Sequence, residues 1–391
     1  MRGIAAFSVL LHHSALAFPV IYDDTRADGL TTVNALKYTP LHAFFAGNPA
    51  VIVFFVLSGL VLAIPFVEGR GNGYRAFIVK RVCRLWPPYA VAVAAAFLLA
   101  ATIGGSGLSG MSGWFNEKWQ DPITAASIAE HASLVASFDN NVFNPVIWSL
   151  VHEMRVSLVF PALVLATVLL GWKRGLTLAL LISCIGVLAR SGIGGGDYWG
   201  TLKYLPCFVV GILLAVHRKA LGALIERLSS RMTAALAAAA LLAYSWPFWV
   251  NSDWFPGPLA RAVHTPVTDL VAILLGATVL ILLAQRPGRA QSALLSRVPQ
   301  FLGRISYSLY LLHVVVLLTV LHVFGGVVQP VLLLPIVWVV AIVLADVMQR
   351  VVERPSQNLG RHLAAHRAIA SPTAVPAPAE SSQAIPLAEG R

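Results

Sequence analysis

The sequence predicts an all-α integral membrane protein with about ten transmembrane helices and with both termini in the cytoplasm. Of the 391 residues, 58% are hydrophobic and only 12% are charged, about half the charged share of a typical soluble domain. The mean hydropathy is +0.76. Apolar stretches that approach the roughly 20 residues needed to cross a hydrocarbon core also recur along the whole chain.

The expected transmembrane helices follow one another in the order 3–20, 50–67, 87–104, 149–170, 174–190, 203–216, 232–250, 267–285, 305–324 and 330–349. The positive-inside rule supports this count, because omitting one helix would scramble the loop charges. With a cytoplasmic N-terminus, 21 of the 28 Lys and Arg fall in cytoplasmic segments. The net charge of +11 therefore reflects topology and does not indicate nucleic-acid binding.

Residues 1–361 are expected to form one membrane domain, and residues 362–391 a disordered cytoplasmic tail. The tail contains "SPTAVPAPAESSQAIPLAEGR", which is rich in Ala, Pro and Ser and lacks aromatic residues, a composition that cannot build a packed core. Cys83, Cys184 and Cys207 lack metal-ligand spacing. We expect them to be packing residues and expect no metal site.

The opening stretch "MRGIAAFSVLLHHSALAF" carries ionisable side chains in an apolar segment, where they are costly and usually functional. On a helix, His13 lies about 20° around from Arg2 and roughly 16 Å further along, whereas His12 points about 80° away from the direction of Arg2. Arg2 and His13 therefore share a face. Two alternatives are a structural histidine bonded to a neighbouring helix and a secretory signal peptide cleaved after Ala15–Ala17.

Five further motifs follow in the chain. "AVIVFFVLSGLVL" (50–62) is expected to break a helix at Ser58 and Gly59, small residues that permit close backbone approach. "KRVCRLWPPY" (80–89) puts two arginines on one helical face before a Pro pair that begins the next span. "NPVIWSLVHEMRVSLVFP" (144–161) buries Glu153 about 8 Å into a span that begins near Trp148. The last two are "GRISYSLYLLH" (303–313) and "VVERPSQNLGR" (351–361).

Taken in this order, the motifs resemble those of the acyltransferase 3 family, over roughly residues 1–361. The family O-acylates sugars, cell-wall polymers and some secondary metabolites. The resemblance implies a multi-pass enzyme of the bacterial inner membrane that takes acyl-CoA, acetyl-CoA in particular, as donor and a hydroxyl as acceptor. The family's Arg/His motif on the first helix falls on Arg2 and His13, and its paired arginines fall on Arg81 and Arg84. Its Trp-Ser-Leu-x-x-Glu motif falls on Trp148, Ser149, Leu150 and Glu153.

The residues suggest roles in acyl transfer. His13 is suited to general-base catalysis, with Glu153 orienting its imidazole. Arg81 and Arg84 could bind coenzyme A phosphates by charge-assisted hydrogen bonds, and Arg2 could order the donor. The alternative for the pair is positive-inside anchoring.

Other polar residues allow a second interpretation. Ser306 and Tyr310 could line a donor tunnel, but hydroxyl side chains where a helix starts are often interfacial anchors. Glu353 is expected to cap a helix or form an ion pair at the cytoplasmic surface. A proton-coupled transporter would also bury a His and a Glu among many helices, although the sequence shows no convincing internal repeat.

Overall fold

The structure is a computed structural model that describes residues 1–22, 32–71, 73–136, 139, 142–192 and 197–368. These residues form helices and connecting loops without β-strands, so the predicted all-α fold is confirmed for them. Seven helices in the described ranges are long and apolar enough to cross a membrane. They are Gly47–Val67 (α4), Gly73–Ile103 (α5), Ile147–Gly192 (α8), Tyr198–Val216 (α9 and α10), Pro266–Leu283 (α15), Arg297–Phe324 (α17) and Pro330–Ala365 (α18 into α19).

The ten predicted stretches all lie largely in helices, but they do not map one to one onto these seven. The first stretch forms α1 (Arg2–Leu16), which has only 15 residues, and α2 (Pro19–Tyr22). The stretches 149–170 and 174–190 share α8, which bends at Gly171, where φ is 72°, a backbone conformation that glycine adopts readily. The stretch 232–250 begins in α12 (Ser230–Tyr244), also of 15 residues. The number of crossings therefore stays a prediction.

The last of the seven long helices consists of α18 (Pro330–Met348) and α19 (Arg354–Ala368), and the elements not yet given bounds are short. They are α3 (Thr32–Lys37), η1 (Pro40–Phe45), α6 (Gly113–Asn116), α7 (Ala125–Ala132), α9 (Tyr198–Lys203), α10 (Leu205–Val216), α11 (Arg218–Glu226), α13 (Trp246–Trp249), η2 (Ser252–Trp254), α14 (Pro258–Val263), α16 (Arg289–Leu294) and the π-helix η3 (Gln349–Glu353). Helix α19 runs past the predicted start of the tail, and residues 369–391 lie outside the described residues.

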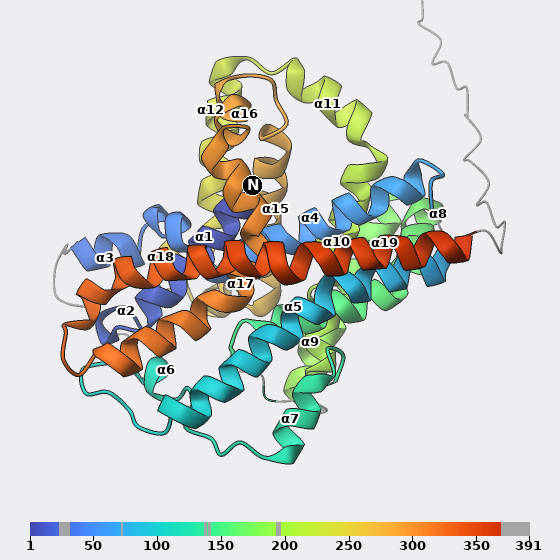
Figure 1. The fold of residues 1–391 in the computed structure, drawn as a ribbon. Helices are drawn as coiled ribbons and strands as arrows, with labels where there is room; N and C mark the ends of the chain where they lie inside the picture. The colour runs from blue at the N-terminus through green and yellow to red at the C-terminus, as the bar shows by residue number, and fades with distance from the viewer. Residues whose placement is uncertain (23–31, 72, 137–138, 140–141, 193–196, 369–391) are drawn as a thin grey trace, which may run out of the picture.

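Helix α1 packs against both α17 and α4, in the centre of the bundle (Figure 1). A Cβ added at Gly3 of α1 would lie 2.4 Å from the Gly303 backbone nitrogen of α17, so the two helices touch backbone to backbone at this point. Helix α1 is therefore packed among the other helices as part of the bundle.

Helix α4 is continuous across Ser58 and Gly59, so the predicted break is wrong. The glycine serves helix packing instead, as its small size allows. A Cβ at Gly59 would lie 2.5 Å from the Phe208 carbonyl oxygen of α10, and one at Gly211 would lie 2.4 Å from the Val56 carbonyl oxygen.

Helix α5 begins at Gly73 and continues through Pro87 and Pro88. The Pro pair therefore lies inside the helix and does not begin it, contrary to the sequence prediction. As a result Arg81 and Arg84 lie on the same continuous helix as the apolar segment after them. Helix α19 packs along α5.

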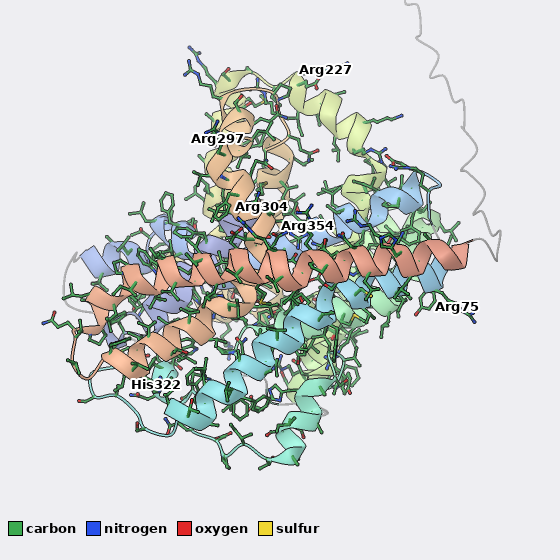
Figure 2. The ribbon with its side chains drawn as sticks, viewed as in Figure 1. Arg75, Arg227, Arg297, Arg304, His322 and Arg354 are labelled. Atoms are coloured by element: carbon green, nitrogen blue, oxygen red, sulfur yellow. The ribbon has the colours of Figure 1, made fainter. Side chains whose placement is uncertain are left out.

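Figure 2 labels five arginines that the sequence assigns to cytoplasmic segments: Arg75, Arg227, Arg297, Arg304 and Arg354. Arg227 and Arg297 lie at the top of the view, Arg75 at the right, and Arg304 and Arg354 near the centre, whereas His322, near the end of α17, lies at the lower left (Figure 2). The side that faces the cytoplasm remains a prediction.

Candidate active site

A small cavity lies at the N-terminal end of α1, between α1, α4, α8 and α17. Its volume is about 20 Å³, room for about one water molecule. It is lined by Arg2, Val51, Phe54, Phe55, Ser149, Leu150, Glu153, Ser306, Tyr307 and Tyr310. The fold thus brings together six residues that the sequence singled out on three separate motifs: Arg2, Ser149, Leu150, Glu153, Ser306 and Tyr310.

The Arg2 guanidinium is poorly paired. Its Nε is buried without a hydrogen-bond partner, and its nearest aromatic contact places Cζ 5.8 Å from the Phe54 ring centre. Arg84 on α5 likewise makes no hydrogen bond or ion pair within the described part of the chain. Both guanidinium groups interact electrostatically with the Glu353 carboxylate. They therefore remain available to an anion.

Arg81 is paired within the protein. Its Nη2 donates to Glu153 Oε1 at 2.7 Å and its Nε donates to Ser157 Oγ at 3.1 Å. Ser58 Oγ donates to the same Glu153 oxygen at 2.9 Å. The network links α4, α5 and α8. Among the described residues, Glu153 hydrogen-bonds to this network rather than to His13, the partner that we expected from the sequence.

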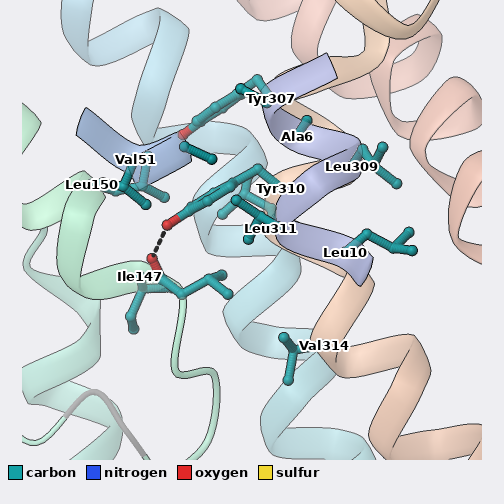
Figure 3. Close-up of a cluster of buried hydrophobic side chains, with 14 of the residues drawn as sticks. Ala6, Leu10, Val51, Ile147, Leu150, Tyr307, Leu309, Tyr310, Leu311 and Val314 are labelled. Carbon is teal, nitrogen blue, oxygen red and sulfur yellow. Dashed lines mark hydrogen bonds between the residues drawn. The ribbon is translucent and has the colours of Figure 1, made fainter. Parts of the chain in front are cut away.

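The polar side chains at the start of α17 are also internally bonded. Ser306 Oγ donates to the Gly303 carbonyl at 2.9 Å. Tyr310 Oη donates to the Val146 carbonyl at 3.1 Å and lies 2.7 Å from Ser149 Oγ. Figure 3 shows Tyr307 and Tyr310 extending from α17 toward the helices that carry Val51 and Leu150. These hydroxyls tie the cavity wall to its neighbours.

Glu353 lies in the interior rather than at the surface where the sequence placed it. It is only 4% exposed. Ser308 Oγ of α17 donates to its Oε2 at 2.7 Å, and Gln357 Nε2 donates to its Oε1 at 3.0 Å. It ends the π-helix η3, a rare element that is frequent at functional sites. In the sequence, the only signal for a buried, functional Glu353 is the motif 351–361 in which it lies.

Two histidines meet toward the other end of α1. His313 of α17 lies with Nε2 3.0 Å from His13 Nδ1. His13 Nδ1 is also 3.0 Å from the Val9 carbonyl oxygen, one turn back on α1. The His13 ring is 5.6 Å from the Trp114 ring. The sequence could not indicate this contact, because the two histidines are 300 residues apart.

His12 has separate partners, as the helical geometry predicts. Its Nδ1 donates to the Phe45 carbonyl at 3.1 Å. A Cβ at Gly47 would lie 2.3 Å from the His12 ring, so this ring is wedged against the start of α4. The ring of its neighbour His42 stacks on the Phe248 ring with 3.5 Å between the ring centres, and burial lowers the pKa of His42 to about 3.

Lys118, just after α6, is a buried cation near His13. Its side chain is 1% exposed, lies 3.8 Å from the Glu117 carboxylate and stands 5.5 Å from the Trp114 ring centre. Burial lowers the pKa of Lys118. Trp114 therefore contacts both this ammonium group and the His13 imidazole.

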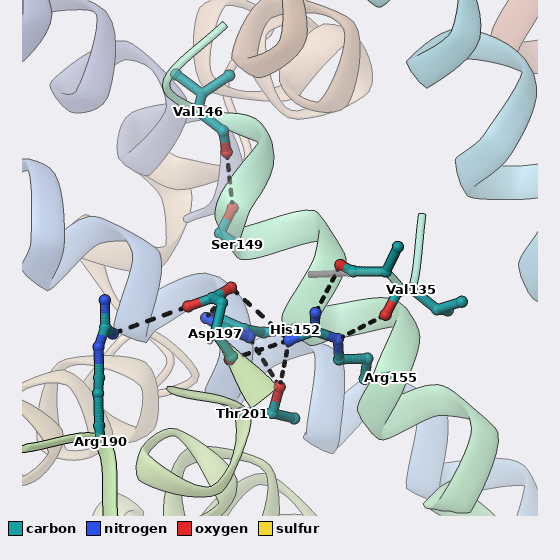
Figure 4. A network of polar contacts seen from close by, with 9 residues as sticks. Val135, Val146, Ser149, His152, Arg155, Arg190, Asp197 and Thr201 are labelled. Atoms are coloured by element: carbon teal, nitrogen blue, oxygen red, sulfur yellow. Dashed lines mark hydrogen bonds and ion pairs between the residues drawn. The ribbon is translucent and has the colours of Figure 1, made fainter. Parts of the chain in front are cut away.

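A second polar network surrounds His152 (Figure 4). His152 Nδ1 lies 2.9 Å from Thr201 Oγ1, and Arg155 Nη1 donates to the same oxygen at 3.1 Å. Arg155 also donates to the carbonyls of Val135 and Ala136. These bonds pin the loop after α7 to α8 and α9, a structural task that leaves little of Arg155 free.

The described ranges hold no cluster of metal ligands, and a larger cavity elsewhere in the bundle is apolar. No group of three or more His, Cys, Asp or Glu side chains able to hold a metal ion is found there. A larger cavity of about 480 Å³ lies between α8, α10, α11 and α15. Its lining is apolar apart from His217 and Thr278.

Comparison with known proteins identifies the family of the chain. A family model of an acyltransferase domain matches residues 1–350. The chain belongs to the acyltransferase 3 family. No curated protein and no solved structure matches it. As a member of the acyltransferase 3 family, it is a multi-pass membrane O-acyltransferase, and the transporter alternative is not favoured.

Proposed function

We propose that this acyltransferase 3 protein moves an acyl group, acetyl in particular, from acyl-CoA to a hydroxyl of a sugar, a cell-surface glycan or a secondary metabolite. We place it in the bacterial inner membrane. The observation that carries the proposal is the composition of one face of α1. An incompletely paired guanidinium, that of Arg2, stands at one end, and His13 stands eleven residues later.

Arg2 and Arg84 fit the donor's phosphates. Neither makes a hydrogen bond or a close ion pair among the described residues, and both can donate several charge-assisted hydrogen bonds in a planar fork. The extended pantetheine arm of coenzyme A separates its phosphates from its thioester. An arm laid along α1 would carry the thioester from the arginines toward His13.

Arg81 and Glu153 form part of the wall and the charge of the donor site, without binding the donor directly. The Arg81 side chain is committed to Glu153 and Ser157, so it contributes positive charge and a fixed wall more than free donor groups. Glu153 lines the small cavity with Arg2. Ser306 and Tyr310 complete that wall, which must widen to admit an acyl-CoA because its present volume is about 20 Å³.

The reaction needs a base for the acceptor hydroxyl. As the hydroxyl oxygen attacks the thioester carbonyl, His13 Nε2 accepts the hydroxyl proton, and the C–O bond forms. The C–S bond then breaks, and the imidazolium returns the proton to the departing sulfur. The products are an ester and free coenzyme A. A positioned base typically contributes about 10²- to 10⁴-fold to such a step.

The test is a transfer assay on the purified protein in detergent or lipid. Labelled acetyl-CoA is supplied with candidate hydroxyl acceptors, and the assay records ester formation together with thiol release. We expect both products in equal amounts, and both to form about 10²-fold or more slowly with His13→Ala. Acyl-CoA that is bound but neither hydrolysed nor transferred to any acceptor class would contradict the proposal.

A further inference from the structure

We propose that His313 is the positioning residue of His13: it fixes the tautomer of the His13 imidazole so that Nε2 is the free basic nitrogen. The inference rests on the proposed function, in which His13 is the base. It assigns a role to a residue on α17, 300 positions away in the chain.

The tautomer follows from two backbone carbonyls. His313 Nδ1 lies 3.0 Å from the Leu309 carbonyl oxygen. A carbonyl oxygen only accepts, so this ring nitrogen carries the hydrogen. A neutral imidazole has one N–H and one bare nitrogen, which makes His313 Nε2 an acceptor.

The assignment then passes to His13. His313 Nε2 is 3.0 Å from His13 Nδ1, so that Nδ1 must carry the hydrogen and donate it. The Val9 carbonyl, also 3.0 Å from His13 Nδ1, accepts from the same side and reinforces the choice. The remaining nitrogen, His13 Nε2, keeps its lone pair and has no hydrogen-bond partner among the described residues.

The surroundings keep both rings neutral at rest. The His13 ring contacts the His12, His313 and Trp114 rings, and the Lys118 ammonium group lies 5.5 Å from the Trp114 ring centre. No carboxylate contacts either His13 or His313 in the described parts of the chain. Two adjacent positive imidazoles in a desolvated site would repel each other, and each would lose its hydration.

His313 is also held rigidly enough to act as a reference. It is 1% exposed, and the Tyr310 ring lies 5.9 Å from its own. When His13 Nε2 takes up a proton, the Nδ1–H bond to His313 becomes charge-assisted and therefore stronger. His313 thus favours the protonated base that forms during the reaction, without itself touching the substrate.

The experiment compares His313→Gln with His313→Leu. The Gln amide oxygen can occupy roughly the place of the imidazole Nε2 and accept from His13 Nδ1–H, whereas Leu fills similar space without an acceptor. We expect His313→Leu to lower kcat about 10- to 100-fold, part of the contribution of the base, with an unchanged KM for acyl-CoA. His313→Gln should recover most of the rate. Equal loss in both variants at equal folded protein would overturn the inference.

Two further measurements separate this inference from the proposed function. In the His13→Ala background, adding His313→Leu should cost no additional rate, because the residue it positions is gone. Nitrogen-15 NMR of the wild-type imidazoles should show His13 protonated on Nδ1, and protonation on Nε2 would refute the inference even if the variants fold poorly. A fully active His13→Ala would instead refute the proposed function. An inactive His13→Ala with two fully active His313 variants would refute only the positioning role.

Discussion

Arg81 on α5 donates to the Glu153 carboxylate on α8 across 2.7 Å, and both side chains are almost fully buried. Ser58 of α4 shares the carboxylate. The pair therefore joins three helices in the middle of the protein. The two arginines of the α5 motif therefore differ: Arg81 is paired with a carboxylate, whereas Arg84 has no comparable partner in the described residues.

We predict that Arg81→Ala destabilises the protein by about 3–5 kcal/mol, since it leaves the Glu153 carboxylate buried and uncompensated. Thermal unfolding of the purified variant in detergent measures the effect. Arg84→Ala is the matched control on the same helix and should leave the unfolding temperature nearly unchanged. Equal unfolding temperatures for wild type and Arg81→Ala would show that the pair does not hold the helices together.

Donor binding should depend on Arg84 in a different way. Arg84→Ala is expected to weaken acyl-CoA binding by about 1.5–3 kcal/mol through a lost charge-assisted hydrogen bond. Titration of purified protein with acetyl-CoA measures this affinity. Arg75→Ala, an exposed arginine near the start of the same helix, should bind normally. If both variants bind as tightly as wild type, Arg84 is only a topology anchor.

The contact between α4 and α10 should tolerate no side chain at Gly211. Its added Cβ would meet the Val56 carbonyl oxygen at 2.4 Å, so Gly211→Ala should cost about 1–3 kcal/mol of stability, as overpacking does. Gly222→Ala is the control, because a Cβ there meets nothing within 4 Å. A Gly211→Ala protein that unfolds at the wild-type temperature would contradict the close packing.

The sequence predicted correctly those features that depend on a single helix. Apolar length located the helices, and the 100° step per residue separated His12 from His13, which indeed have different partners. It failed where two helices meet. The ion pair between Arg81 and Glu153, which are 72 residues apart, depends on how the helices pack, and so does the contact between His13 and His313. Hydropathy does not encode this packing.

The failures at α4 and α5 have a related cause. Gly59 weakens a helix locally, yet close packing on α10 compensates. Pro87 and Pro88 break the pattern of a soluble helix, whereas neighbouring segments can stabilise a proline within a membrane helix.

The predicted topology can be tested with a reporter fused after Ala368, where α19 ends. We expect a cytoplasmic signal, because most basic residues lie in segments assigned to that side. A second reporter in the loop around residue 121, between α6 and α7, should be on the opposite side. A periplasmic signal from the first fusion would contradict the ten-helix prediction.

The most direct test of the account is the initial acyl-transfer rate per inserted protein for His13→Ala and His12→Ala. His13 presents a free Nε2, whereas His12 donates to the Phe45 carbonyl and is wedged against Gly47. We predict a loss of about 10²-fold or more for His13→Ala, the contribution of a general base. His12→Ala should keep most of the rate and show its effect mainly in protein abundance. Equal loss in both variants, or greater loss at His12, would contradict the assignment of His13 as the base.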